Sequence, residues 1–247
     1  MQLIYHEPIF VPETESTNSY LAELCDCKQL AEMTCVYTAF QSAGRGQRGN
    51  SWESEPGKNL LFSFVLYPQF LKANRQFLIS QITALGLMTA LSMHVDDISI
   101  KWPNDIYWKD KKIAGTLIEN DLNGSRISRT IVGTGININQ TEFLSGAPNP
   151  VSLSQITGLH YDPRDILIET MDEISQLYID LKNGSKKTIR TSYMNHLYRK
   201  DGLAPYRDKN GQFMATIEDI DHSGKIILRD ENNKLREYMF KEVEFVL

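Results

Sequence analysis

Residues 41–52, which read Gln-Ser-Ala-Gly-Arg-Gly-Gln-Arg-Gly-Asn-Ser-Trp, constrain the fold more than any other stretch of the chain. They satisfy the Gly-x-Gly-x-x-Gly pattern of dinucleotide-binding folds, which requires a strand before the glycines and a helix directly after them. Residues 35–40 are rich in β-branched and aromatic side chains, so a strand is expected there. Residues 55–58, Glu-Pro-Gly-Lys, form turns and leave no place for the helix. A Rossmann fold is therefore not expected.

The same loop sets two arginines, Arg45 and Arg48, between Gly44, Gly46 and Gly49. Glycine lets the backbone approach a bound group closely, and a planar guanidinium matches the oxygens of a carboxylate or phosphate. The loop therefore predicts a clamp for an anionic ligand. The alternative interpretation is a solvated, glycine-rich surface loop.

Composition narrows the class of protein. The 247 residues suffice for one large domain and a small appendage, and 41% hydrophobic with 23% charged residues is typical of a globular protein. A net charge of −5 argues against a general nucleic-acid binder. The three cysteines lack a metal-ligand spacing and indicate reduced thiols. The sequence has neither a signal-peptide pattern nor an apolar run of membrane length, so we expect a cytoplasmic protein without a membrane partner.

The hydrophobic patterns predict strands, long helices and a change of architecture near residue 200. A nearly continuous apolar run covers residues 60–66, and apolar spacings of three and four residues mark a helix at 77–94. Short strands separated by turns near the C-terminus predict a small all-β barrel of about 45 residues. The remaining predicted strands are 9–11, 98–102, 106–108, 112–120 and 129–132. Three further helices are predicted: one that begins near residue 20, one that begins at 162, and one that covers 188–198.

Polar residues with functional potential lie at the ends of these elements. Ser16 and Thr17 stand at the start of a helix, where hydroxyls act as N-caps and free N–H groups can also bind a ligand. Asn104 and Asp105 follow a strand and a proline, in a position suited to ligand groups but equally to an ordinary turn.

Lys112 begins a strand, and Gly115 follows three residues later. A glycine inside a strand suggests that another group approaches closely, whereas the alternative for the lysine is an exposed edge charge. Asn137 and Asn139 alternate after two glycines, which would place both amides on one face of an extended chain. Such amides suit the edge of an adenine or a ribose.

Five motifs follow one another in a specific order. They are Ser-Thr-Asn at 16–18, the glycine-arginine loop at 44–52, Lys-Trp-Pro-Asn-Asp at 101–105, Lys-Ile-Ala-Gly at 112–115 and Gly-Thr-Gly-Ile-Asn at 133–137. Over essentially its full length the chain resembles the biotin–protein ligase (biotin–[acetyl-CoA-carboxylase] ligase) family. The resemblance implies an α+β fold with two parts. Residues 1–199 would form a catalytic domain, a mixed sheet flanked by helices and related to class II aminoacyl-tRNA synthetases. Residues 200–247 would form an SH3-like barrel.

The resemblance also implies a two-step reaction. Biotin and Mg-ATP give biotinyl-5′-AMP and pyrophosphate, and a lysine of a biotin carboxyl carrier protein domain then takes up the biotin. Cofactors would be ATP and Mg²⁺. Because two anions must meet, the site needs cations aimed at the reacting oxygens. Lys112, Arg45 and Arg48 would supply them.

Further roles carry over by position. The resemblance assigns Asp105 to Mg²⁺, Trp52 to stacking on adenine, and Trp102 to packing. The biotin-binding set implied by the family comprises Ser16, Thr17, Asn18, Gln41, Gly44, Arg45, Gly46, Gln47, Lys112 and Gly115. The ATP-binding set comprises Arg48, Trp52, Asn104, Asp105 and Asn137.

The chain departs from the family pattern at Gln47 and Asn50, where the family often has arginine. The change at Gln47 bears on how tightly biotinyl-AMP is held. Only about fifteen residues precede Ser16, too few for the winged-helix domain of the repressor branch, so no DNA partner is expected. The resemblance leaves a homodimer open. The alternatives are a lipoate–protein ligase and a non-catalytic regulator that senses biotinyl-AMP.

Overall fold

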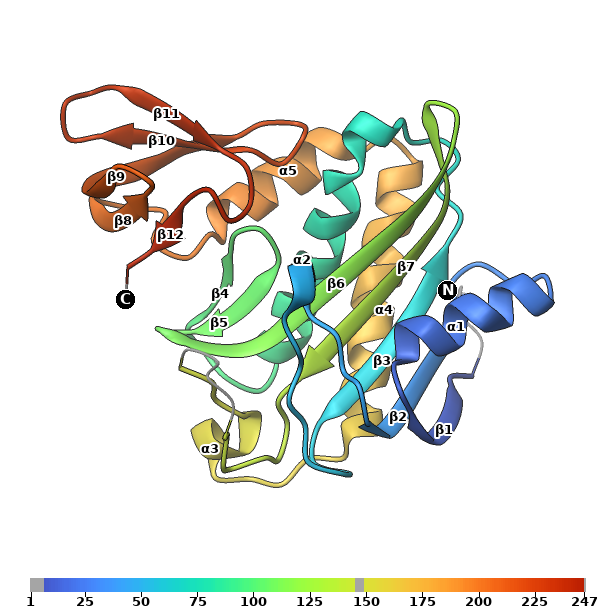
Figure 1. Cartoon of the computed structure of the whole chain (residues 1–247). Helices are drawn as coiled ribbons and strands as arrows, with labels where there is room; N and C mark the ends of the chain where they lie inside the picture. Colours follow the sequence, from blue (N-terminus) through green and yellow to red (C-terminus); the bar gives the residue numbers. More distant parts are fainter. Residues whose placement is uncertain (1–6, 145–148, 247) are drawn as a thin grey trace.

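A computed structural model describes residues 7–144 and 149–246 and shows two β-sheets, the larger one flanked by helices (Figure 1). The larger sheet has seven strands in the order β1-β2-β3-β7-β6-β5-β4. Only the β1–β2 pair is parallel, so the sheet is mixed. Its strands are β1 (Ile9–Thr14), β2 (Cys35–Gln41), β3 (Leu60–Leu66), β4 (Ile98–Lys101), β5 (Asp105–Trp108), β6 (Lys111–Asn123) and β7 (Arg126–Ile136).

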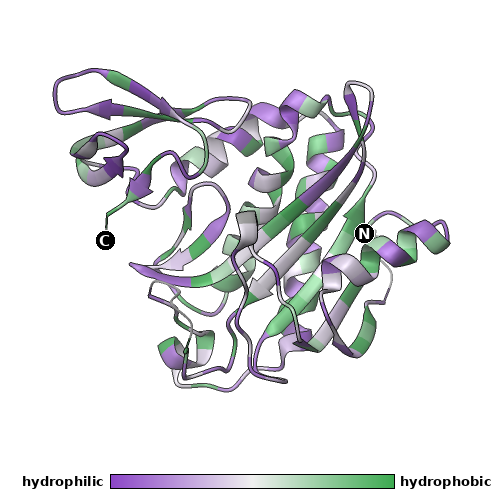
Figure 2. Ribbon diagram, viewed as in Figure 1, coloured by the Kyte–Doolittle hydropathy of each residue, from purple (hydrophilic) through white to green (hydrophobic). Residues whose placement is uncertain are grey.

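Helices cover both faces of this sheet. Helix α1 packs on β2, β3 and β7 on one face, and α2 and α4 pack on each other across the opposite face (Figure 1). All seven residues of β3 are buried because the strand lies between these layers, and its apolar run appears green in Figure 2. The helices are α1 (Thr17–Cys27), α2 (Phe77–Ser92), α3 (Leu153–Thr157), α4 (Pro163–Lys182) and α5 (Lys186–Asn195), with short 3-10 turns η1 (Gln47–Gly49) and η2 (Ala73–Arg75).

The C-terminal residues form a separate five-stranded antiparallel sheet in the order β11-β10-β9-β8-β12. A buried contact joins it to the first part of the chain: Trp102 Nε1 donates to the Gly224 carbonyl at 2.9 Å. The Trp102 ring also meets Phe240 edge to face. The packing role expected of Trp102 is therefore confirmed. The strands are β8 (Ala204–Asp208), β9 (Gly211–Ile220), β10 (Ile226–Asp230), β11 (Leu235–Tyr238) and β12 (Glu244–Phe245).

The predicted strands and helices are present, with differences that have physical causes. The last long helix ends at Asn195 and not at 198, because the following residues cover the edge of the sheet: Tyr198 N–H donates to Ile100 O, and Ile100 N–H donates to His196 O. Strand β7 is longer than predicted and runs through two glycines. The short elements α3 and β8 were not predicted. The glycine-arginine loop itself contains only the three-residue turn η1, and residues 50–59 after it form no helix, as expected for a chain that is not a Rossmann fold.

The candidate functional site

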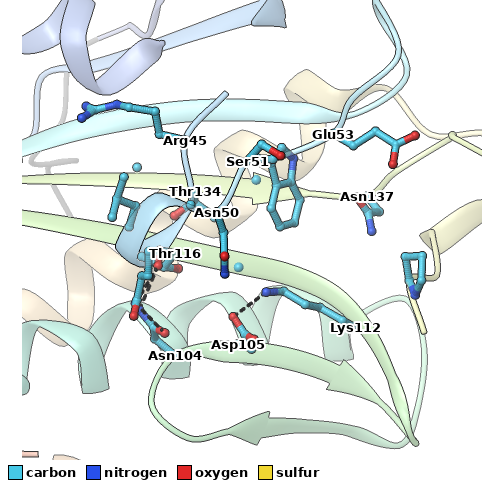
Figure 3. A pocket seen from close by; sticks show the side chains of 18 of the residues that line it. Arg45, Asn50, Ser51, Glu53, Asn104, Asp105, Lys112, Thr116, Thr134 and Asn137 are labelled. Carbon is cyan, nitrogen blue, oxygen red and sulfur yellow. Dashed lines mark hydrogen bonds and ion pairs between the residues drawn. The ribbon is translucent and has the colours of Figure 1, made fainter. Parts of the chain in front are cut away.

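One cavity of about 600 Å³ gathers most of the predicted site residues at the face of β5, β6 and β7 (Figure 3). Its volume is in the range of small-molecule sites. Ser16 and Gly44 are not among its lining residues, and the side chain of Arg48 lies outside what the structure describes. The predicted residues that do line it are Thr17, Asn18, Gln41, Arg45, Gly46, Gln47, Trp52, Asn104, Asp105, Lys112, Gly115 and Asn137.

Glycines on β6 and β7 form one wall of the cavity. Gly115 and Gly135 are directly paired, and the Trp52 indole lies against them: a Cβ on Gly135 would stand 2.3 Å from Trp52 Cε2. A Cβ on Gly133 would likewise stand 2.0 Å from Asn18 Oδ1. The glycines are therefore required for close approach of side chains. The buried Trp52 Nε1 has no hydrogen-bond partner among the described residues.

Lys112 lines the cavity, with its amine over the Trp52 ring. Its Nζ is 2.8 Å from Asp105 Oδ1 and 5.6 Å from the centroid of the Trp52 ring. The lysine side chain is only 25% exposed, so the alternative of an exposed edge charge is wrong. Figure 3 shows the pair reaching toward each other from β5 and β6. This geometry provides a cation beside a carboxylate on the glycine wall.

A chain of hydrogen bonds organises the end of the cavity near α1. Gln41 Oε1 accepts from both Thr17 N–H (2.7 Å) and Thr17 Oγ1 (3.0 Å). Because its oxygen is engaged in this way, the Gln41 amide nitrogen is oriented as a donor. Ser63 Oγ lies 2.7 Å from Thr17 Oγ1 and 2.6 Å from Asn18 Oδ1. Ser63 was not predicted, although a serine inside the apolar run of β3 was a signal that could have found it.

Ser16 plays a different part from the one expected. It occupies the N-cap position of α1 and is 5% exposed, but its side chain makes no capping hydrogen bond to any described residue. The expectation that its hydroxyl caps the helix is therefore wrong for this structure. Its carbonyl accepts the Tyr20 N–H and so begins the helix.

The glycine-arginine loop is a short hairpin. Trp52 N–H donates to Gly44 O at 2.9 Å, and Gly46 N–H donates to Asn50 O at 2.6 Å. Gln47 Nε2 reaches into the cavity, where it donates to Asn104 Oδ1 (3.1 Å) and to Thr116 O (3.2 Å).

Arg45 connects the loop to strand β6. Its guanidinium points away from the pair of Lys112 and Asp105 (Figure 3). It makes two parallel hydrogen bonds to Glu119, at 3.1 and 3.0 Å, because this carboxylate on β6 is within reach and matches the guanidinium fork.

The two asparagines after β7 diverge. Asn137 lines the cavity and donates to Val151 O, whereas Asn139 exchanges hydrogen bonds with the backbone of Tyr161. The expectation that both amides share one face is therefore wrong. The reason is that β7 ends at Ile136, so strand alternation no longer applies. Asn104, in contrast, lines the cavity and donates to Thr116 O at 2.9 Å.

Lys101 is a further cation at the cavity that sequence reasoning left without a role. Its Nζ donates to Tyr107 Oη at 2.9 Å and lies over the Tyr107 and Phe245 rings. Burial lowers the pKa of Lys101, and the nearby Asp105 carboxylate opposes this shift. The cavity thus holds two lysines, one of them ion-paired and one partly desolvated.

Comparison with known proteins identifies relatives along the whole chain. The profile of the Biotin/lipoate A/B protein ligase family matches residues 10–137. A biotin–[acetyl-CoA-carboxylase] ligase of Paracoccus denitrificans is 30% identical over 87% of this chain and 91% of its own length. The bifunctional ligase/repressor BirA of Bacillus subtilis is 27% identical over 98% of this chain and 73% of its own length. The structure of a biotin protein ligase from Aquifex aeolicus, in complex with biotin and ATP, superposes with a TM-score of 0.81 and 25% identity, covering 97% of this chain and 99% of the other.

Proposed function

This chain belongs to the biotin–protein ligase family, and we propose that its cavity is where biotin is activated by ATP before transfer to a carrier lysine. The enzyme is a biotin ligase. A biotin carboxylate oxygen attacks the α-phosphorus of ATP, the bond to the β-phosphate oxygen breaks, and pyrophosphate leaves. The lysine amine then attacks the acyl carbon of biotinyl-AMP, loses a proton and releases AMP.

The observation that carries the proposal is the position of Lys112 Nζ, 2.8 Å from Asp105 on the glycine wall of the cavity. Two anions repel each other as they meet, and charge builds on the phosphate oxygens in the transition state. A lysine in a partly buried cavity stabilises that charge more than it would in water. Asp105 holds the lysine in place until the substrates arrive.

One group of cavity residues suits biotin and another suits ATP. Gln41, whose oxygen is held by Thr17, presents an amide N–H donor, which suits the oxygen of a ureido ring. Gly115 lets the Lys112 amine and the Trp52 ring lie close against the sheet, where both can face the substrates. Trp52, with its unpartnered indole N–H, would stack on adenine beside Asn104 and Asn137.

Mg²⁺ is expected with ATP, and the residues fit a cation that arrives with the nucleotide. Mg²⁺ is usually held by one or two carboxylates plus phosphate oxygens. Asp105 would hold it, and no group of three or more metal-ligating side chains occurs within residues 7–144 and 149–246. When bound, the cation would neutralise phosphate charge.

The remaining assignments are also proposals. We assign the catalytic domain to residues 1–199, related to class II aminoacyl-tRNA synthetases, and an SH3-like barrel to residues 200–247. The acceptor would be a biotin carboxyl carrier protein domain, and the compartment the cytoplasm. No helix in the described part of the chain is long and apolar enough to cross a membrane. The lack of a DNA partner is a prediction, and the family resemblance leaves a homodimer open.

The test is pyrophosphate release from Mg-ATP with biotin, with lipoate and with neither, followed by transfer of labelled biotin to a carrier domain. Release that depends on biotin, and label on the carrier, support the proposal. A preference for lipoate would indicate the lipoate branch of the family. Tight binding of biotinyl-AMP without turnover would indicate a sensor.

A further inference from the structure

Glu119 joins two parts of the site that are distant in the sequence. Its carboxylate accepts two hydrogen bonds from Arg45 and a third, at 2.8 Å, from Asn18 Nδ2. Arg45 belongs to the loop and Asn18 to helix α1, whereas Glu119 itself is on β6. The carboxylate therefore connects a loop, a helix and the sheet through three donors.

From Asn18 the connection continues to the α1 end of the cavity. Ser63 Oγ donates to Asn18 Oδ1 at 2.6 Å and also contacts Thr17 Oγ1. Thr17 Oγ1 in turn donates to Gln41 Oε1. Asn18 and Ser63 are buried, at 3% and 0% exposure, so their orientations are fixed by these partners. The position of Arg45 is thereby tied to the groups proposed to bind the biotin ring.

On the other side, Arg45 fixes the loop hairpin. Its neighbours Gly44 and Gly46 make the cross-hairpin hydrogen bonds to Trp52 and Asn50. The hairpin in turn places the Trp52 indole on Gly135. A shift of Arg45 would therefore move the aromatic wall of the cavity together with the loop.

The pair is suited to orienting the loop more than to stabilising the fold. The Arg45 and Glu119 side chains are 44% and 43% exposed, and exposed ion pairs add little to the free energy of unfolding. Two parallel bonds nevertheless restrict the direction of the guanidinium, which a single contact would not. Loss of the pair is thus expected to loosen the loop while the protein stays folded.

We propose that Glu119 is a positioning residue of the biotin site: it holds Arg45 and Asn18 together and so sets the glycine-arginine loop over the cavity. Its part in the reaction rests on the proposed function, whereas its hold on the loop does not. Glu119 is not among the residues that line the cavity, so it acts through Arg45 and Asn18.

The test compares Glu119→Gln, Arg45→Gln and the double variant with wild type. Asp121→Asn is a matched control, because Asp121 lies two residues further along β6 and pairs with Arg129, away from the loop. Hydrogen exchange of residues 44–52 is measured without ligand, and kcat and KM for biotin are measured in the pyrophosphate assay.

Glu119→Gln should speed exchange of the loop and raise KM for biotin roughly three- to tenfold, with a smaller change in kcat. The double variant should exchange no faster than Arg45→Gln alone, since both changes break one contact. Asp121→Asn should match wild type. Unchanged exchange, additive effects in the double variant, or faster exchange with an unchanged KM would each overturn the proposal. A wild-type protein without biotin-dependent turnover would overturn the proposed function, while the exchange data would still decide whether Glu119 holds the loop.

Discussion

Lys112 Nζ and Asp105 Oδ1 lie 2.8 Å apart in the cavity, where the paired strands β5 and β6 bring the two side chains together. The ion pair keeps the lysine extended along the glycine wall, and neither side chain is more than 29% exposed. A substrate anion can bind the Lys112 amine, either beside the Asp105 carboxylate or in its place. This relationship underlies the proposed adenylation site.

The glycine wall predicts the effect of a single added carbon. Gly135→Ala would place a Cβ 2.3 Å from Trp52, too close for the ring to stay. We expect the Trp52 emission to shift to longer wavelength and the affinity for ATP to fall about tenfold. Fluorescence and ATP titration measure both, with Ser128→Ala, on the same strand, as control. Unchanged emission and affinity would show that the ring does not depend on this glycine.

Ligands should change the dynamics of the loop. Its glycines make an ordered state costly in backbone entropy, and a bound anion adds contacts for its arginines. Biotin together with ATP should therefore slow hydrogen exchange across residues 44–52. Equal exchange with and without ligands would mean that the hydrogen bonds of Arg45 and Gln47 already hold the loop fully closed.

Gln47 allows a test of the departure from the family pattern. Its amide donates to Asn104 and to the Thr116 carbonyl, whereas an arginine would add a charge-assisted contact to the adenylate. Such contacts contribute about 1.5–3 kcal/mol. We expect Gln47→Arg to slow dissociation of biotinyl-AMP by about ten- to a hundredfold and to reduce stray biotinylation. Equal dissociation rates at the same salt concentration would make the departure neutral.

Asp230 gives a prediction for pH. Asp230 is 4% exposed, and its carboxylate accepts hydrogen bonds from the backbone N–H groups of Lys234 and Asn232 and from Arg236. The Lys234 N–H, first among these partners, holds the pKa of Asp230 below its ordinary value of 3.8. A lowered carboxyl pKa stabilises the folded state above about pH 4, and this contribution is lost as the pH falls through the folded-state value.

Asp230→Asn should therefore lower the Tm at pH 7 and flatten its fall below pH 4. Glu231→Gln, at the exposed neighbouring position, is the control. Thermal unfolding at a series of pH values measures the effect. A variant that follows the wild-type profile would show that this carboxylate does not contribute to stability.

Much of the fold could be predicted because the apolar runs are long and unambiguous. The run that became β3 predicted a strand with the observed bounds, and Asp162 followed by Pro163 marked the start of α4 correctly. The gathering of the motifs into one site followed from the family resemblance and not from spacing. Local sequence cannot show that residues on separate strands meet.

The parts that were not predicted depend on tertiary contacts. Glu119 is 74 residues from Arg45, and no local pattern marks it as a partner. Asn139 left the site because β7 ends three residues earlier, a boundary that sequence patterns locate poorly. Lys101 looked like part of a strand, and only burial among Tyr107 and Phe245 distinguishes it from a surface lysine.

The most direct test of the account is biotin-dependent pyrophosphate release by Lys112→Ala. Loss of one donor to the transition state should slow release by on the order of 10²–10³-fold while circular dichroism shows an unchanged fold. Lys111→Ala, one residue earlier and exposed, should release pyrophosphate as fast as wild type. Release by Lys112→Ala near the wild-type rate would contradict the central claim that this lysine carries the adenylation of biotin.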